Sequence, residues 1–221
     1  MFPLFDYQFR DLFTLLSPKL FLTAYSCALM ETQILITSSN YYQLMLVAES
    51  ITTLLNPFKW QHVYVPILPN KLGFHYLDAP TPFIMGINSR YSSSLTNHQQ
   101  IFCKIDCDNH SVECADLESI VLPPFLDDLQ VELEELLKQY LKVSSFGFGA
   151  QSDALKRVNQ IAKKHNVINE FDYLDDLKLN QAIRMLFYRT IKRNILTKYQ
   201  QFIFPGNTKK VFLPCFYLET F

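Results

Sequence analysis

The stretch from Val47 to Ile87, VAESITTLLNPFKWQHVYVPILPNKLGFHYLDAPTPFIMGI, decides the fold of this chain. It begins as the end of a helix, since apolar residues recur at the three- and four-residue spacing of one helical face, and the helix breaks at Asn56-Pro57. Two short apolar runs follow, His62–Val65 and Pro82–Ile87, rich in the β-branched and aromatic side chains that strands favour. Because neither run alternates with polar residues, we expect two strands inside a covered sheet.

The segments before this stretch alternate between helical and extended patterns. Apolar spacing predicts a helix over Tyr7–Leu16, and Ser17 followed by Pro18 is typical of the start of a second helix, reaching about Thr32. A short strand over Gln33–Thr37 and a helix over Tyr41–Leu55 follow. This alternation with short connections predicts an α/β fold, with a central mixed or mostly parallel sheet flanked by helices.

The second half of the chain is mainly helical by pattern. Ile101–Asp106 and Ser111–Cys114 predict a hairpin, and Phe125–Leu141 predicts an amphipathic helix. The run Val143–Ala150 contains the small residues typical of a hinge. We therefore predict an α/β domain over residues 1–143 and a small all-helical domain over residues 144–221, with helices over Ser152–His165 and from Tyr173 to about Phe202.

The composition excludes several classes of protein. Of the 221 residues, 49% are hydrophobic and 14% aromatic, which excludes disorder. Leu12–Met30 is the nearest approach to a membrane span, but Ser17-Pro18-Lys19 interrupts it. Five cysteines without framework spacing fit a reducing cytosol. Only five glycines disfavour a loop that cradles a nucleotide, and with it a metabolic α/β enzyme.

The stretch that decides the fold also resembles a known family. Pro57–His62 (PFKWQH), Tyr64–Pro69 (YVPILP) and Leu77–Pro80 (LDAP) resemble the core of a DENN domain, in particular that of the Rab-interacting subfamily that carries RUN and PLAT modules. The resemblance implies a core DENN lobe over residues 1–143 and the downstream lobe over residues 144–221, whose end Leu218–Thr220 looks like that lobe's final segment. No upstream longin-like lobe is recognisable, and we expect that lobe and the RUN and PLAT modules in a full-length chain.

The resemblance also implies a function. DENN domains are guanine-nucleotide exchange factors or binding partners of Rab GTPases, so we expect a cytoplasmic protein of vesicle trafficking, peripherally recruited to Golgi, endosomal or vesicle membranes. In one hypothesis the chain promotes GDP release by engaging the switch regions of a Rab. In the other it is a non-catalytic effector or scaffold that binds the GTP form. An exchange factor prefers the empty GTPase and an effector prefers the GTP-loaded one.

The residue pattern indicates no bond-making active site, no cofactor and no metal. Cys103, Cys107, His110 and Cys114 are residue types that bind zinc, but their spacing is not that of a zinc finger or knuckle. Strand alternation alone places Cys103 and Cys107 on one face, which favours buried structural cysteines. No serine or cysteine lies in the context of a nucleophile elbow. Protein exchange factors need none of these features.

Such a protein needs a broad binding surface with a few aromatic or arginine anchors. In open α/β sheets, recognition occurs outside the carboxyl ends of the strands. The candidates at this position are Ser39, Asn40, Tyr41 and Tyr42 after the first strand, and Arg90 and Tyr91 after the third. The alternative interpretation is that these residues cap helices and fill loop space.

Charge is distributed unevenly, although the net charge is −1. Ten acidic and no basic residues lie between Ile105 and Leu137, whereas eight basic and no acidic residues lie between Lys178 and Lys210. Two solvated helix faces that attract each other explain this pattern. Alternatively, a basic face meets an anionic membrane or an acidic partner, through Arg184, Arg189, Lys192, Arg193 and Lys198. Nucleic acid is a poor fit, because the basic residues share no stripe and lack interleaved aromatic side chains.

Overall fold

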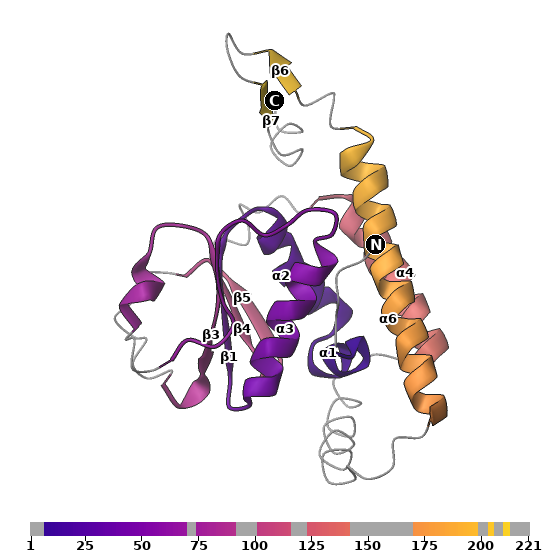
Figure 1. Cartoon of the computed structure of the whole chain (residues 1–221), viewed down its shortest axis with the longest axis horizontal. Helices are drawn as coiled ribbons and strands as arrows, with labels where there is room; N and C mark the ends of the chain where they lie inside the picture. The colour runs from indigo at the N-terminus through magenta and orange to yellow at the C-terminus, as the bar shows by residue number, and fades with distance from the viewer. Residues whose placement is uncertain are drawn as a thin grey trace.

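Figure 1 shows the computed structural model of the chain, which describes residues 7–69, 74–91, 101–115, 123–141, 170–198, 203–205 and 210–212. The elements in order are α1 (Phe9–Leu15), α2 (Pro18–Leu29), β1 (Gln33–Ser38), α3 (Tyr41–Leu54), β2 (Val63–Val65), the 3₁₀ helix η2 (Phe74–Asp78), β3 (Phe83–Asn88), β4 (Cys103–Asp106), β5 (Ser111–Cys114), α4 (Phe125–Leu141), α6 (Glu170–Ile191), the π-helical turn η5 (Lys192–Leu196), β6 (Ile203–Pro205) and β7 (Lys210–Phe212). The predicted helix over residues 152–165 and the predicted hinge over residues 143–150 lie outside the described residues.

Five strands form one sheet in the order β2-β3-β1-β4-β5. Strand β1 pairs in parallel with β3 on one side and with β4 on the other, and β2 pairs in parallel with β3. Strand β5 runs antiparallel to β4, because the tight turn between them returns the chain directly. The predicted α/β fold, with a mixed, mostly parallel sheet flanked by helices, is confirmed. Strands β6 and β7 form a separate antiparallel pair that the sequence analysis did not predict.

Helices α2 and α3 begin where the sequence predicts. The Ser17 hydroxyl accepts a hydrogen bond from the backbone N–H of Leu20 (3.4 Å), and Asn40 Oδ1 accepts one from the N–H of Tyr42 (2.9 Å). Helix α2 ends three residues earlier than expected. Glu31 adopts a φ of 53°, and this left-handed residue ends the helical backbone, after which the N–H of Thr32 donates to the Cys27 carbonyl oxygen at 3.1 Å.

In the described part of the chain, the α-helices lie on one face of the sheet, whereas η2 packs on the other through Leu77 (Figure 1). Buried side chains of α1, α2, α3, α4 and α6 join Ile34 and Ile36 of β1 in a single large hydrophobic cluster. Residues that alternate with these along the strands, such as Leu35 and Met85, point to the opposite face and pack in a smaller cluster that includes Leu68. The two faces of the sheet are therefore covered by different amounts of the described protein.

Helix α6 belongs to the same core as the sheet. Phe187 packs edge-on against Phe21 and Tyr25 of α2, with ring centroids 6.3 and 5.0 Å apart. The side chain of Asn180 accepts a hydrogen bond from the backbone N–H of Phe9 at 2.9 Å, which satisfies a donor at the start of α1. Segments 171 residues apart are thus joined inside the core. The predicted domain boundary between residues 143 and 144 falls outside the described residues and stays a prediction.

A close approach of two chain segments requires glycine at position 86. A Cβ atom placed there would lie 2.0 Å from the carbonyl oxygen of Pro66 and 3.4 Å from Cβ of Leu44. The chain after β2 crosses at this point, where the N–H of Leu68 donates to the Gly86 carbonyl oxygen at 2.7 Å. Gly86 therefore allows the segment after β2 to run directly over β3.

In the described part of the chain, no single helix is long and apolar enough to cross a membrane. Helices α1 and α2 meet that criterion only when taken together, and they are bent by 105° where they meet. Phe9, Leu12 and Phe21 of these helices are fully buried. The interrupted apolar run noted in the sequence thus corresponds to two helices of the protein core.

Candidate functional site

The carboxyl ends of β1, β3 and β4 meet at one edge of the sheet because the three strands are parallel. The register places Ser38 beside Asn88 and Thr37 beside Asp106 at this edge. The side-chain amide of Asn88 donates to the Ser39 carbonyl oxygen at 3.1 Å, which links the segments after β1 and β3. The structure therefore brings the two predicted groups of candidate residues together, as expected.

Asp108, in the turn after β4, connects this edge to the segment after β1. Its carboxylate accepts hydrogen bonds from the backbone N–H of Ser39 (2.8 and 3.0 Å), the Ser39 hydroxyl (3.0 Å) and the Ser38 hydroxyl (3.2 Å). Burial raises the pKa of this carboxyl, but hydrogen bonds from Ser89, Ser39 and Ser38 together hold the pKa below its ordinary value. Asp108 is therefore ionised, and its carboxylate holds the segment after β1 at this edge by hydrogen bonds. This role was not predicted from the sequence, although the acid lies in the turn directly after a predicted strand.

Two tyrosines at the start of α3 are the largest exposed groups on this edge. The side chains of Tyr41 and Tyr42 are 46% and 43% exposed. The Tyr42 hydroxyl donates to the Asp11 carboxylate of α1 at 2.8 Å, and its ring lies 5.7 Å from that of Tyr7. Burial and the nearby Asp11 charge raise the pKa of Tyr42, so it stays a neutral donor. Tyr42 thus links the start of α3 to α1, and both tyrosines remain partly exposed.

Arg90 and Tyr91 follow β3 on the same edge. The backbone N–H and the Nε–H of Arg90 donate to Asn88 Oδ1, at 3.2 and 2.8 Å. The Arg90 guanidinium lies 5.9 Å from the centre of the Tyr91 ring, within the range of a cation–π contact. These contacts, together with the Asn40 helix cap, agree with the alternative in which the residues stabilise loops. Their role in binding a partner stays a prediction.

The predicted basic residues lie on α6 and the turns that follow it. Arg189, Lys192, Arg193 and Lys198 are exposed, whereas Arg184 is half-buried. Burial lowers the pKa of Arg184 from its ordinary value. Arg189, Lys192 and Arg193 stand at positions i, i+3 and i+4, which lie on the same side of a helix, whereas Lys198 follows five residues further on, beyond η5.

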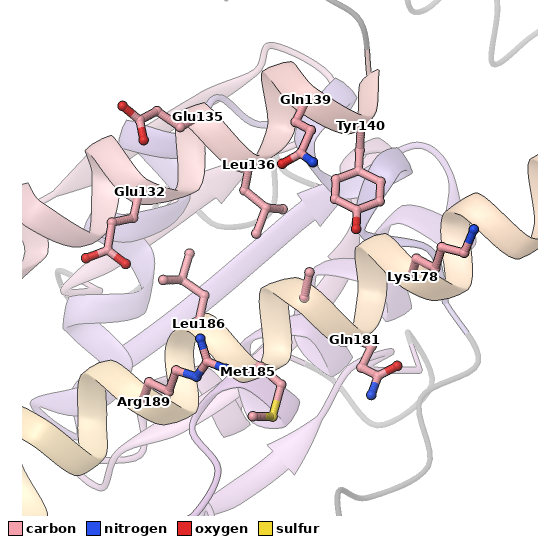
Figure 2. A pocket seen from close by; sticks show the side chains of 11 residues that line it. Glu132, Glu135, Leu136, Gln139, Tyr140, Lys178, Gln181, Met185, Leu186 and Arg189 are labelled. Atoms are coloured by element: carbon pink, nitrogen blue, oxygen red, sulfur yellow. The ribbon is translucent and has the colours of Figure 1, made fainter.

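A groove of about 620 Å³ is lined by residues of α4 and α6, which pack against each other. Figure 2 shows that Glu132 and Glu135 of α4 lie across this groove from Arg189 of α6. The apolar side chains of Leu136 and Leu186 lie between the charged groups. The acidic and basic segments of the sequence therefore face each other here, as the hypothesis of two attracting helix faces expects.

The four residues considered as zinc ligands do not come together. Cys103 and Cys114 are direct neighbours across β4 and β5, and they lie near Cys27 of α2. His110 instead contacts the Leu15 carbonyl oxygen through Nδ1 at 2.7 Å. The preference against this zinc set agrees with the structure, but Cys27 was not considered, because it is 87 residues from Cys114.

Comparison with known proteins agrees with the resemblance. Residues 1–110 match the family model of the DENN (AEX-3) domain. Among curated proteins, the chain is 39% identical over 92 residues (42% of this chain) to the DENN domain and WD repeat-containing protein SCD1 of Arabidopsis thaliana. It is 34% identical over 98 residues (44%) to mouse DENN domain-containing protein 3, and 31% identical over 102 residues (46%) to Elicitor of plant defense protein 1 of Gibberella zeae.

The matched regions cover 8%, 8% and 9% of those three proteins, so the chain corresponds to a small part of each relative. The DENN resemblance of the N-terminal half is confirmed. The narrower assignment to the subfamily with RUN and PLAT modules is not supported. All strands of the main sheet except β5, and the whole of the polar edge described above, lie within the matched residues 1–110.

Proposed function

We propose that the carboxyl edge of this sheet binds a Rab-family small GTPase and promotes release of its GDP. The observation that carries the proposal is the pair of exposed tyrosines, Tyr41 and Tyr42, on a frame that Asp108 and Asn88 hold rigid by hydrogen bonds. This frame lies within the residues that match the DENN domain. Exposed aromatic side chains on a preorganised backbone are typical anchors of protein interfaces.

The proposed activity requires no bond-making residue. A GTPase that holds its nucleotide with nanomolar affinity has a binding free energy of about −12 kcal/mol. An exchange factor lowers the barrier to release by engaging the switch segments that the phosphates and Mg²⁺ keep ordered. By linkage, the exchange factor then binds the empty GTPase more tightly than the GDP-bound one, by the same factor by which it weakens GDP.

A second function uses the same edge. If the edge prefers a GTP-loaded Rab, the chain is an effector or scaffold, and no release is accelerated. The edge supports both alternatives equally, since anchoring aromatic groups serve either purpose.

The wider cellular role is also a proposal. We place the chain in a trafficking protein of the cytoplasm that is recruited to Golgi, endosomal or vesicle membranes. The exposed basic groups on α6 and η5, such as Arg189 and Lys192, would add attraction to anionic lipid, which amounts to about 1 kcal/mol per basic residue near the surface. RUN and PLAT modules and an upstream longin-like lobe stay expectations for a full-length chain.

The test is release of fluorescent GDP from a panel of purified Rabs, with the full chain at increasing concentration. Acceleration for one Rab is expected, and Tyr41→Ala should weaken binding to that Rab by about 30-fold, as loss of an interface anchor of about 2 kcal/mol does. The matched control is Tyr76→Ala, which removes a tyrosine of similar exposure (45%) from η2, outside the carboxyl edge.

The outcomes separate the alternatives. Accelerated release that falls in Tyr41→Ala but not in Tyr76→Ala supports exchange through this edge. Preferential binding of GTP-loaded Rab without acceleration selects the effector. An equal loss in both tyrosine variants, or binding to no Rab in any nucleotide state, would contradict the proposed role of the edge.

A further inference from the structure

Three cysteine side chains converge where α2 packs against β4 and β5. Cys27 comes from the last turn of α2, Cys103 opens β4 and Cys114 closes β5. Their sulfur atoms all lie within 4.8 Å of one another, and Sγ of Cys27 is 3.6 Å from Sγ of Cys114. We call these three residues the thiol cluster.

The backbone holds the thiol cluster in place from both sides. Cys103 and Cys114 are directly opposite each other in the antiparallel register of β4 and β5, and the N–H of Ala115 donates to the Phe102 carbonyl oxygen at 2.7 Å beyond them. On α2, the hydroxyl and N–H of Thr32 both donate to the Cys27 carbonyl oxygen, at 3.0 and 3.1 Å. The three sulfur atoms are thus presented by regular, hydrogen-bonded structure rather than by loose loops.

The thiol cluster is open on one side. Cys27 and Cys103 are fully buried, whereas Cys114 is half-buried. Cysteines that only fill the core need no mutual contact, as Cys107 shows: it is also fully buried but is not part of the cluster. A half-exposed member gives an ion or a reagent a way to the buried sulfur atoms.

The sulfur spacing fits a metal ion. With metal–sulfur bonds of 2.3 Å, two thiolate ligands lie about 3.8 Å apart around a tetrahedral ion and about 4.0 Å apart around a trigonal one. The 3.6 Å between Cys27 and Cys114 differs from these values by a few tenths of an ångström. A disulfide would need the same two sulfur atoms to approach to about 2.05 Å, which is a larger displacement.

We propose that Cys27, Cys103 and Cys114 form a three-thiolate site for a soft d¹⁰ cation, Zn²⁺ or Cu⁺. Thiolates favour both ions over hard cations such as Mg²⁺ and Ca²⁺. Within the described part of the chain, no fourth His, Cys, Asp or Glu side chain completes the group. Three sulfurs alone suit Cu⁺, whereas Zn²⁺ prefers four ligands and would take a water or an external ligand at the open side.

Binding of the cation displaces the thiol protons and changes no oxidation state. Thiols bind such a cation as thiolates, so each of the three cysteines releases its proton to solvent when the ion binds. No electron is transferred, and no oxidant or reductant is consumed.

The test uses the full chain, made metal-free and kept reduced with a phosphine under anaerobic conditions. Zn²⁺ is titrated against a chromogenic zinc chelator, and Cu⁺ against a Cu⁺ chelator, in separate experiments. We expect one equivalent of at least one of the two ions to bind. Cys114→Ser should weaken that binding by more than about 100-fold, since even residues that only orient a ligand account for 10- to 100-fold.

Cys107→Ala is the matched control, because it removes a buried cysteine of the same core that is not part of the thiol cluster. Circular dichroism and the thermal midpoint confirm that each variant is folded. A second measurement needs no variant: bound ion should slow alkylation of Cys114 in the unaltered chain, detected by peptide mass spectrometry.

Each outcome decides the proposal, independently of whether the chain binds a GTPase. One equivalent bound, lost in Cys114→Ser and kept in Cys107→Ala, supports it, and the two titrations then show which ion is preferred. Binding of neither ion by the reduced chain overturns it. Equal affinity in Cys114→Ser and the unaltered chain, or alkylation at an unchanged rate in the presence of ion, overturns it as well.

Discussion

The helix-covered face of the sheet and the carboxyl edge of the same strands are stabilised by different interactions. The face is a continuous apolar cluster in which aromatic rings such as Phe21, Tyr25 and Phe187 pack together. The edge is polar, and Asp108 and Asn88 tie its segments together by hydrogen bonds. The face therefore supplies most of the free energy of folding, and substitutions at the edge should lower the free energy of unfolding by less than substitutions in the face. A binding surface on the edge would thus be held rigid by its own hydrogen bonds, and its exposed side chains could differ without changing the packing of the core.

The largest expected effect tests the face. Phe187→Ala removes a fully buried ring that contacts two others, so we expect the free energy of unfolding to fall by about 3–5 kcal/mol. Chemical denaturation measures this change. The control is Val131→Ala on α4, whose side chain is 58% exposed and whose effect should stay within about 0.5 kcal/mol. Similar midpoints for the two variants would show that α6 does not share the core.

A smaller effect tests the crossing over β3. Gly86→Ala places a methyl group where the Pro66 carbonyl oxygen lies, and backbone cannot yield as a flexible side chain does. We expect a loss of about 1–3 kcal/mol, the usual range for an overpacked core, measured by chemical denaturation. A Gly86→Ala variant as stable as the unaltered chain would show that the segment after β2 can shift away from β3 without loss of stability. Gly86 lies two residues before Asn88, so this test also reports on the strand that carries the edge.

The smallest effect on stability tests the edge. Asp108→Ala removes the acceptor of the Ser38 and Ser39 hydrogen bonds, and we expect a loss of about 1 kcal/mol, since the carboxylate is exposed to solvent. The pKa of Asp108 is lowered in the folded chain, so its contribution is present above the ordinary value of 3.8 and is lost as pH falls through the lower folded value.

The difference between Asp108→Ala and the unaltered chain should therefore shrink when thermal melts are repeated at decreasing pH below about 4. Asp128→Ala, which removes an exposed acid of α4 that does not line the groove, serves as the control for a general loss of negative charge. If the stability difference between Asp108→Ala and the unaltered chain does not change with pH, the charge of Asp108 does not contribute to stability, and only the packing of its side chain does.

Local patterns in the sequence predicted most of the elements of this fold. Ser17-Pro18 and Asn40 define helix starts through their own backbone contacts, and the apolar runs around Tyr64 and Ile84 predict strands. Strand β3 is buried as expected, but β2 lies at the edge of the sheet and its Val63 is 42% exposed, so the prediction of a covered strand is wrong there. These signals act over a few residues, so they can be recognised in one sequence. The parallel arrangement also followed, because short helical connections leave few other topologies.

The contacts that were missed join distant parts of the chain. Cys27 meets Cys114 across 87 residues, and Asn180 meets Phe9 across 171. Local spacing instead suggested Cys103, Cys107, His110 and Cys114 as one group, of which the structure brings only two together. Similarly, the edge residues were placed on the correct side of the sheet, but the role of Asp108 depends on a pairing between β1 and β4 that no local pattern specifies.

The Asn180 hydrogen bond to the start of α1 has a consequence for how the chain divides. The family model matches residues 1–110, yet the first helix of the matched region donates its leading amide hydrogen to Asn180 of α6, and α6 shares its hydrophobic cluster. The hydrophobic cluster that contains this helix therefore extends beyond the residues that match the family model. A protein cut at the limit of similarity would expose Phe21 and Tyr25 to water, so α6 must accompany the sheet in any piece of this chain that is made for study.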